Sequence, residues 1–230
     1  MNEGVREAIT AGRSGTALLR IQELEPAERR RVGAELPALL RELRERSTYG
    51  LIEGPVADAL LLAGLAAISG AAAAANWLAR SDLVWQVVRW ERGKRVRTPN
   101  LEAAVAGRPE EWVADVVRRA AGRIRDRWQH EGLWTAVAAL VPLAGGTPPT
   151  DDMFVLGWTR WAPDLPWRLA DDPFTDTLVP RLFEVDGAGD ASWVEPVAAL
   201  VASGRLDRAE VLDQCVRRLL RGGRAQDLRW

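Results

Sequence analysis

Apolar residues recur along this chain at intervals of three and four positions, which is the spacing of an amphipathic α-helix. The most apolar segment runs from Pro55 to Trp90, and small residues divide it into two or three helices that we expect at the centre of the core. Gly64, Gly70 and the alanines at 71–75 have almost no side-chain volume, so a neighbouring helix could approach closely there. The rest of the chain should be organised around this core stretch.

Residues 1–46 predict a short helix followed by a pair of helices. The step from Glu25 to Pro26 should start the last of these helices, because proline is favoured at the first helical position. Pro37 lies inside the same helix and predicts a kink or a break, since it cannot donate the helical hydrogen bond.

Further helices are expected after the core stretch. A helix capped by Asp82 should be followed by a basic loop over 91–98 and a short helix over 101–106. The sequence from Arg108 to Glu111 then opens an amphipathic helix, with acidic residues in its first turn. Apolar residues recur every four positions along one face of this helix, at Trp112, Val116, Ala120 and Ile124. Basic residues recur with the same spacing along the opposite face, at Arg119, Arg123 and Arg127.

The second half of the chain differs in composition. A helix over 128–143 ends at a loop rich in glycine and proline near 144–150. Short helical pieces are expected beyond this loop at 152–161 and 173–184. Two regular helices are expected after them, at 192–202 and 207–220. Asp207 should cap the last of these helices.

The pattern contains no strand of alternating apolar and polar residues, so the predicted fold class is all-α. Helices follow one another in pairs of about 35 to 45 residues, which is the rhythm of a HEAT-like α-solenoid of antiparallel helix pairs. We expect a single helical-repeat domain over residues 1–230, with the loop near 144–150 separating a basic-leaning half from an acidic-leaning half. The alternative is an irregular compact helical bundle.

Composition narrows the class of protein. Hydrophobic residues make up 47% of the chain and charged residues 27%, which are values of a folded globular protein. Asp58 and Asn76 interrupt the apolar window over 57–79 and Arg80 follows it directly, so we predict no membrane partner and a cytoplasmic location. The eleven tryptophans, against three phenylalanines and one tyrosine, should fill the seams between helices.

Candidate chemistry is scarce in the sequence. Cys215 is the only cysteine and His130 the only histidine, which excludes an internal disulfide, a cysteine-based zinc site and most histidine-based catalytic sites. The aspartate pairs at 151–152 and 171–172 stand where helix caps belong, and no calcium-loop spacing surrounds them. We therefore predict no catalytic, cofactor-binding or metal-binding residue, and a protein that is not an enzyme.

Charge is distributed unevenly along a chain whose formal net charge is −1. Residues 80–130 hold twelve Lys and Arg against seven Asp and Glu, whereas residues 131–200 hold three against eleven. The basic and the acidic segment could each simply form a solvent-exposed face. Alternatively, they could form two surfaces that bind different partners. The predicted interaction surface is the set of basic residues Arg95, Arg97, Arg119, Arg123 and Arg127.

Three stretches of the chain, over 17–45, 60–83 and 211–229, resemble a family of large, uncharacterised actinobacterial helical-repeat proteins, loosely grouped with MolR-type proteins. The resemblance implies a helical-repeat fold and no particular activity or catalytic residue. Members of that family are longer, which implies either a short member or the N-terminal part of a longer protein.

A solenoid offers a long binding face and needs no pocket, so the predicted function is a non-enzymatic scaffold for protein–protein interaction. Another protein is the first expected partner. The alternative is a nucleic-acid-associated regulator, in which the basic residues contact phosphates and Trp90 or Trp128 stacks on bases.

Overall fold

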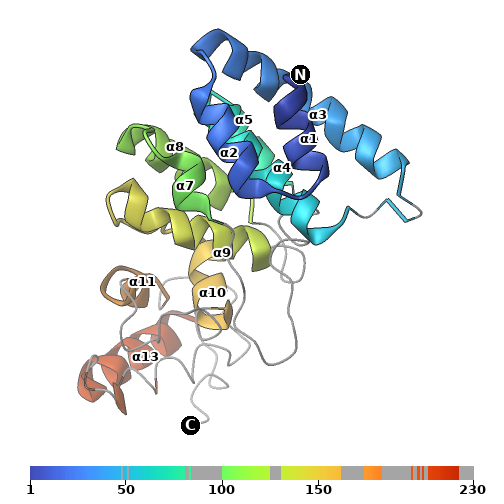
Figure 1. Cartoon of the computed structure of the whole chain (residues 1–230). Helices are drawn as coiled ribbons and strands as arrows, with labels where there is room; N and C mark the ends of the chain where they lie inside the picture. The colour runs from blue at the N-terminus through green and yellow to red at the C-terminus, as the bar shows by residue number, and fades with distance from the viewer. Residues whose placement is uncertain are drawn as a thin grey trace. The chain divides into compact units, whose positions relative to one another are not determined.

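The computed structural model describes residues 1–47, 49–50, 52–80, 83, 100–124, 131–161, 174–182, 198, 201–202, 204 and 207–222. Every regular element in these ranges is helical, which confirms the predicted all-α class (Figure 1). The chain divides into two compact units, residues 1–146 and 147–230. The boundary falls inside the loop predicted near 144–150, and one continuous repeat domain stays a prediction.

The first unit contains most of the described helices. They are, in chain order, α1 (Glu3–Thr10), α2 (Ser14–Glu23), α3 (Pro26–Glu45), α4 (Gly54–Ala67), α5 (Ala71–Leu78), α7 (Leu101–Val105), α8 (Glu110–Ala121), α9 (Glu131–Leu140) and the 3-10 helix η1 (Val141–Ala144). The three helices predicted before residue 46 and the short helix near 101–106 are confirmed. The helix predicted to start at Asp82 lies outside the described residues except for Leu83.

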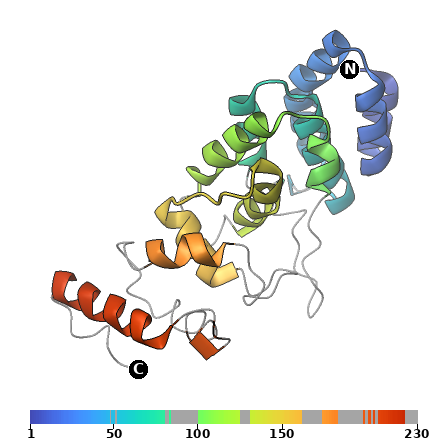
Figure 2. The ribbon, with the colours of Figure 1, turned by 90° about the vertical axis from the view of Figure 1, so that its left-hand side faces the viewer.

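Helix α4 is the centre of the first unit. Eleven of its fourteen residues are buried, because α1, α2, α3, α5 and α7 all pack against it (Figures 1 and 2). Fully burying one leucine contributes about 1.5–3 kcal/mol, so the run Leu60–Leu62 makes a large contribution to the stability of this unit. Within the described ranges, no helix is both long enough and apolar enough to cross a bilayer.

One indole fixes α5 against α4. Trp77 is 2% exposed, and its Nε1–H donates a hydrogen bond of 3.2 Å to the backbone oxygen of Leu61. A Cβ atom at Gly64 would overlap the Trp77 ring, so the predicted close approach at Gly64 is confirmed. The same prediction at Gly70 is wrong, because a Cβ atom there would meet nothing within 4 Å.

Helix α3 runs through Pro37 without a break, so that part of the prediction is wrong. Pro37 has no N–H to donate to the backbone oxygen of Gly33, four residues earlier. Packing offsets this loss, because α3 lies against α4 at Gly33. A Cβ atom at Gly33 would lie only 3.1 Å from the backbone oxygen of Ala67, so the glycine allows the two helices to approach closely.

The second unit contains α10 (Asp152–Trp161), α11 (Thr175–Leu182) and α13 (Arg208–Gly222). Helices α10 and α11 pack together through Phe154 and Phe174, whose ring centroids lie 6.4 Å apart in an edge-to-face arrangement. The bounds predicted for α10 are confirmed. Helix α11 lies within the helix predicted over 173–184, of which residue 173 and residues 183–184 lie outside the described residues. Most of the helix predicted over 192–202 also lies outside them.

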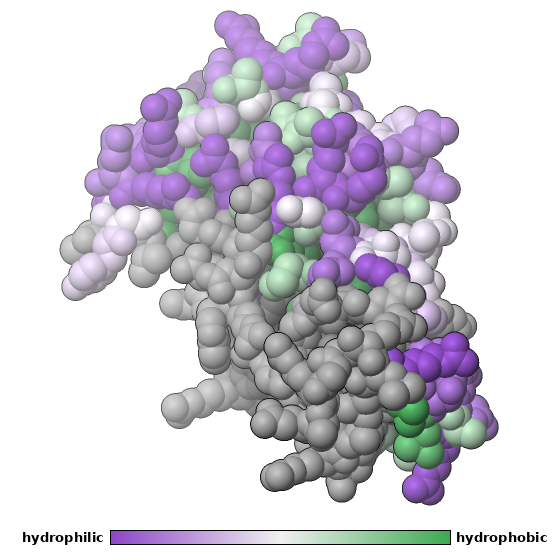
Figure 3. Space-filling view, turned by 180° about the vertical axis from the view of Figure 1, so that it is seen from behind, coloured by the Kyte–Doolittle hydropathy of each residue, from purple (hydrophilic) through white to green (hydrophobic). Residues whose placement is uncertain are grey.

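The start of α13 confirms the predicted cap. The side chain of Asp207 accepts hydrogen bonds from the backbone N–H groups of Ala209 and Glu210, at 2.7 and 3.0 Å. One face of α13 is apolar and exposed, with Leu212 and Val216 each 47% accessible (Figure 3).

The packing of Trp77 on Gly64 predicts a specific sensitivity to one added methyl group. The substitution Gly64→Ala should destabilise the protein by about 1–3 kcal/mol, because the new Cβ atom overlaps the buried indole. The control Gly15→Ala adds the same atom to α2 at a point with nothing within 4 Å, and should be neutral or stabilising by up to about 1 kcal/mol. Guanidinium denaturation followed by circular dichroism measures both; equal midpoints for the two variants would contradict the packing described here.

Candidate functional site

The predicted basic surface is only partly within the described structure. Three of its five residues lie outside the described residues: Arg95, Arg97 and Arg127. Arg119 is exposed on α8, and its Nε–H donates a hydrogen bond of 2.8 Å to the Asp115 carboxylate. Arg118 pairs with the same carboxylate. The charge of Arg119 is therefore partly offset within its own helix.

The predicted row of three arginines on one helix face is wrong. Helix α8 ends at Ala121, Gly122 caps it, and Arg123 lies in a turn beyond the helix. The N–H groups of Arg123 and Ile124 bond to carbonyls three residues earlier, each at 3.0 Å, which tightens the chain out of the α-helical repeat. Glycine is a weak helix former, and this local signal ends the helix although Ile124 is buried as its spacing predicts.

Neighbouring guanidinium groups favour the charged form of the Asp115 carboxylate. Its hydrogen bond from Arg119 is the largest of the effects that hold the pKa of Asp115 below its ordinary value, and Arg118 acts in the same direction. This local network offsets part of the positive charge on the C-terminal half of α8.

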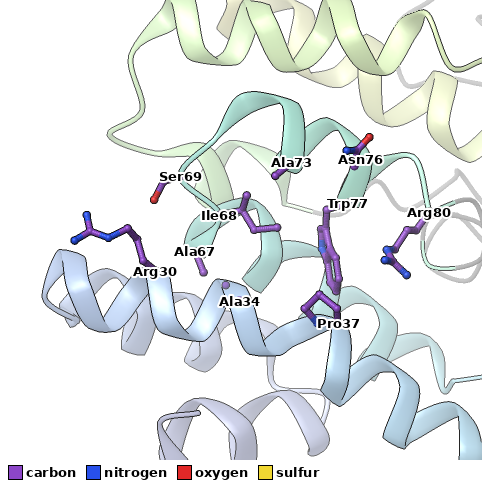
Figure 4. Close-up of a pocket in the computed structure, with 11 residues that line it drawn as sticks. Arg30, Ala34, Pro37, Ala67, Ile68, Ser69, Ala73, Asn76, Trp77 and Arg80 are labelled. Atoms are coloured by element: carbon purple, nitrogen blue, oxygen red, sulfur yellow. The ribbon is translucent and has the colours of Figure 1, made fainter.

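The first unit has an open groove of about 420 Å³ between α3 and α5, above the end of α4. We call it the α3–α5 groove, and it is lined by Arg30, Gly33, Ala34, Pro37, Ala67, Ile68, Ser69, Ala73, Asn76, Trp77 and Arg80. Figure 4 shows Arg30 and Ser69 at one end, Arg80 at the other, and Ile68 and Trp77 between them.

Small apolar side chains make the groove open. Ala34 on α3 and Ala73 on α5 are exposed on its two walls, and a larger residue at either position would fill the space between the helices. The floor is formed by Ala67 and Ile68 at the end of α4. The groove therefore stays open because the side chains at positions 34 and 73 are small and exposed to solvent.

Each end of the groove carries a guanidinium group. Arg30 and Arg80 are both exposed, and in the part of the chain that the structure describes neither has a carboxylate partner. Arg80 lies beside the Trp77 ring, with 5.4 Å between Cζ and the ring centroid. Burial and, secondly, the neighbouring Arg80 lower the pKa of Arg44. The lining contains no Asp or Glu.

The floor is held in place by the start of α8. The Arg108 guanidinium donates to the backbone oxygens of Ala66 and Ile68, at 2.8 and 2.9 Å, and stacks over Trp112 with 4.6 Å from Cζ to the ring centroid. The Trp112 indole N–H donates to the backbone oxygen of Ser69 at 2.7 Å. These bonds satisfy carbonyls at the end of α4 that have no helical donor.

The chemistry available in the groove is that of a binding surface. It offers apolar side chains, two positive charges and the polar groups of Ser69 and Asn76. No carboxylate, thiol or imidazole lines it, and no group of three or more His, Cys, Asp and Glu among the described residues could hold a metal ion. Its lining suits a ligand that is partly apolar and negatively charged.

Sequence reasoning did not identify this groove. Arg80 was apparent only as a charge that interrupts an apolar window, and Arg30 only as one of three consecutive arginines. The available signal was the set of small residues on α5, which we interpreted as a close contact between helices. That set is instead partly exposed, with Ala73 on the groove wall.

Comparisons with protein-family models, with curated proteins and with solved structures gave no match. The resemblance to the actinobacterial helical-repeat family therefore stays a prediction.

The contacts of Arg108 predict that it supports the groove floor. Arg108→Met keeps much of the apolar stem but removes both hydrogen bonds, and should cost about 1.5–3 kcal/mol in the free energy of unfolding. Arg118→Met removes an exposed arginine whose ion pair within the described part of the chain is with Asp115, and should cost less than about 1 kcal/mol. Denaturant unfolding compares the two; a cost for Arg118→Met equal to that for Arg108→Met would contradict the supporting role.

The Asp115 network predicts a titration that NMR can follow. The carboxyl of Asp115 should titrate below the ordinary range of aspartate, and Arg119→Gln should raise its pKa by removing the largest stabilising effect. Arg118→Gln should raise it less. Because the folded-state pKa is lowered, the stabilising effect is present above the unfolded-state pKa and is lost as the pH falls through the folded-state pKa. An Asp115 pKa that Arg119→Gln leaves unchanged would contradict this description.

Proposed function

We propose that this protein is a non-enzymatic scaffold that binds another protein through the α3–α5 groove. The observation that carries the proposal is an open apolar groove with a guanidinium group at each end and no carboxylate in its lining. Peptide segments are commonly recognised in this way, with apolar contacts supplying affinity and a few charged groups supplying specificity.

Nucleic acid is the weaker partner class. Non-specific binding to a nucleic acid depends on several phosphate contacts at once. Asp115 already pairs with Arg118 and Arg119, which reduces the positive charge that α8 could offer to a phosphate backbone. The apolar floor of the α3–α5 groove also favours side chains over phosphates.

We also propose a HEAT-like α-solenoid arrangement for the first unit, and a cytoplasmic location. The solenoid arrangement is supported by the order in which the helices pack. Helices α1, α2 and α3 lie on α4, α5 lies on α8, and α8 lies on α9 (Figure 2). Repeat proteins bury their cores by stacking neighbours in chain order, and the groove would then be one surface of that stack.

A matched pair of double variants tests the proposed function. The groove variant Ala34→Gln with Ala73→Gln fills the groove with uncharged side chains, whereas the control Ala38→Gln with Ala72→Gln changes exposed alanines of the same two helices that do not line it. Each variant is used as bait, with the unchanged chain, in an affinity pulldown from nuclease-treated extract of the source cells, quantified by mass spectrometry. Circular dichroism should show equal helical content.

We expect a partner that the unchanged chain and the control capture equally, and that the groove variant captures roughly tenfold less. A partner captured equally by all three baits would contradict the proposed groove. A partner captured only when the nuclease treatment is omitted would favour the nucleic-acid alternative.

A further inference from the structure

The proposed function leaves open what kind of protein segment the groove takes, and the inference below rests on that function. We infer that the α3–α5 groove binds an acidic amphipathic helix of the partner, whose short apolar face contacts the floor and whose Asp or Glu side chains at its two ends pair with Arg30 and Arg80.

The lining favours a helix over an extended segment. An extended peptide needs partners for its backbone N–H and C=O groups, and such peptides usually take them from the edge of a sheet. The described elements are all helical, and the uncharged polar side chains of the groove are only Ser69 and Asn76. A helix satisfies its own backbone groups, so it needs only apolar contact between the walls.

The side chains on the two walls leave room for that contact. Ala34 and Ala73 are both exposed and face the groove from α3 and α5, and Ile68 lies on the floor between them (Figure 4). Alanine walls allow larger apolar side chains of an incoming helix to enter the space between α3 and α5. Leucine, isoleucine or methionine at i and i+4 of that helix would fill it.

The guanidinium groups at the two ends of the groove determine which residues must flank the apolar face of the bound helix. Arg30 and Arg80 have no carboxylate partner among the described residues, and a guanidinium binds a carboxylate through two parallel hydrogen bonds. Arg80 is already placed by its contact with the Trp77 ring, so it loses less side-chain freedom when it binds. A basic or uncharged segment would leave both guanidinium groups without a partner.

The length of the groove sets a lower limit on the spacing of those acidic residues. Arg30 and Pro37 both line the groove and are seven residues apart on α3, or about 10 Å at 1.5 Å per residue, and Arg80 lies beyond Pro37 (Figure 4). Positions i and i+7 of a bound helix lie on one face and span the same length. The inference is therefore a pair of carboxylates at least two helical turns apart, on either side of the apolar contacts.

The test selects peptides without assuming a sequence. A random peptide-display library of about 14 residues, long enough for four helical turns, is selected against the full chain and counter-selected against the groove variant Ala34→Gln with Ala73→Gln. The selected peptides should be enriched in pairs of Asp or Glu at least seven positions apart, with apolar residues between them. Selected peptides without that enrichment, or no selected peptide, would overturn the inference.

Charge reversal then tests the two arginines directly. Fluorescence anisotropy should show selected peptides binding roughly tenfold more weakly to Arg30→Glu with Arg80→Glu, and Lys-substituted peptides regaining affinity for that variant. The control Arg41→Glu with Arg208→Glu changes the net charge equally at exposed positions outside the groove and should bind as the unchanged chain does. Equal weakening by both variants would overturn the inference, because general electrostatics would explain it.

Two further outcomes would also overturn it. Random-sequence duplex DNA that binds the unchanged chain with the same dependence on Arg30 and Arg80 would make the occupant a nucleic acid. A dimer in sedimentation experiments that Arg30→Glu with Arg80→Glu dissociates would make the occupant a second copy of this chain.

The experiments distinguish protein binding at the groove from recognition of an acidic helix. If the groove variant loses its partner in the pulldown but the selected peptides lack the carboxylate pair, protein binding stands and the acidic helix does not. If all baits capture the same partner equally, the groove itself is not the binding surface.

Discussion

The contact of the Trp77 indole with Gly64 is the constraint on which the first unit depends. It joins α5 to the buried α4 through a hydrogen bond to the Leu61 backbone, and it requires that position 64 carry no side chain. The same contact places the Trp77 ring at the groove, beside Arg80. The contact of Trp77 with α4 therefore contributes both to the core and to the groove wall, and packing of α5 on α8 also holds this wall in place.

Local signals in the sequence were sufficient for much of the fold. Pro26 starts α3, the predicted bounds of α10 are those of the structure, and the Asp207 cap forms as its position predicts. These features depend on neighbouring residues alone, through proline at the first helical position and side-chain caps. Where tertiary packing competes with a local signal, a break was predicted wrongly: α3 continues through Pro37 and packs on α4 at Gly33.

The candidate site was harder to predict because it joins residues that are distant in sequence. Arg30 on α3 and Arg80 after α5 meet at one groove only because both helices pack on α4, and nothing in either local sequence indicates the other. The predicted arginine row relied on periodicity through Gly122, and glycine ended that helix. A row of charges is visible in a sequence, whereas a hollow between helices depends on how their side chains pack.

The most direct measurement of the central claim is amide hydrogen exchange of the full chain, alone and bound to the partner that it captures. The account predicts slower exchange on binding in residues 30–37 and 67–80, which form the walls and floor of the α3–α5 groove. Slower exchange confined to α8 and residues 122–124, with the groove unchanged, would contradict it and would return the interaction surface to the arginines near Asp115.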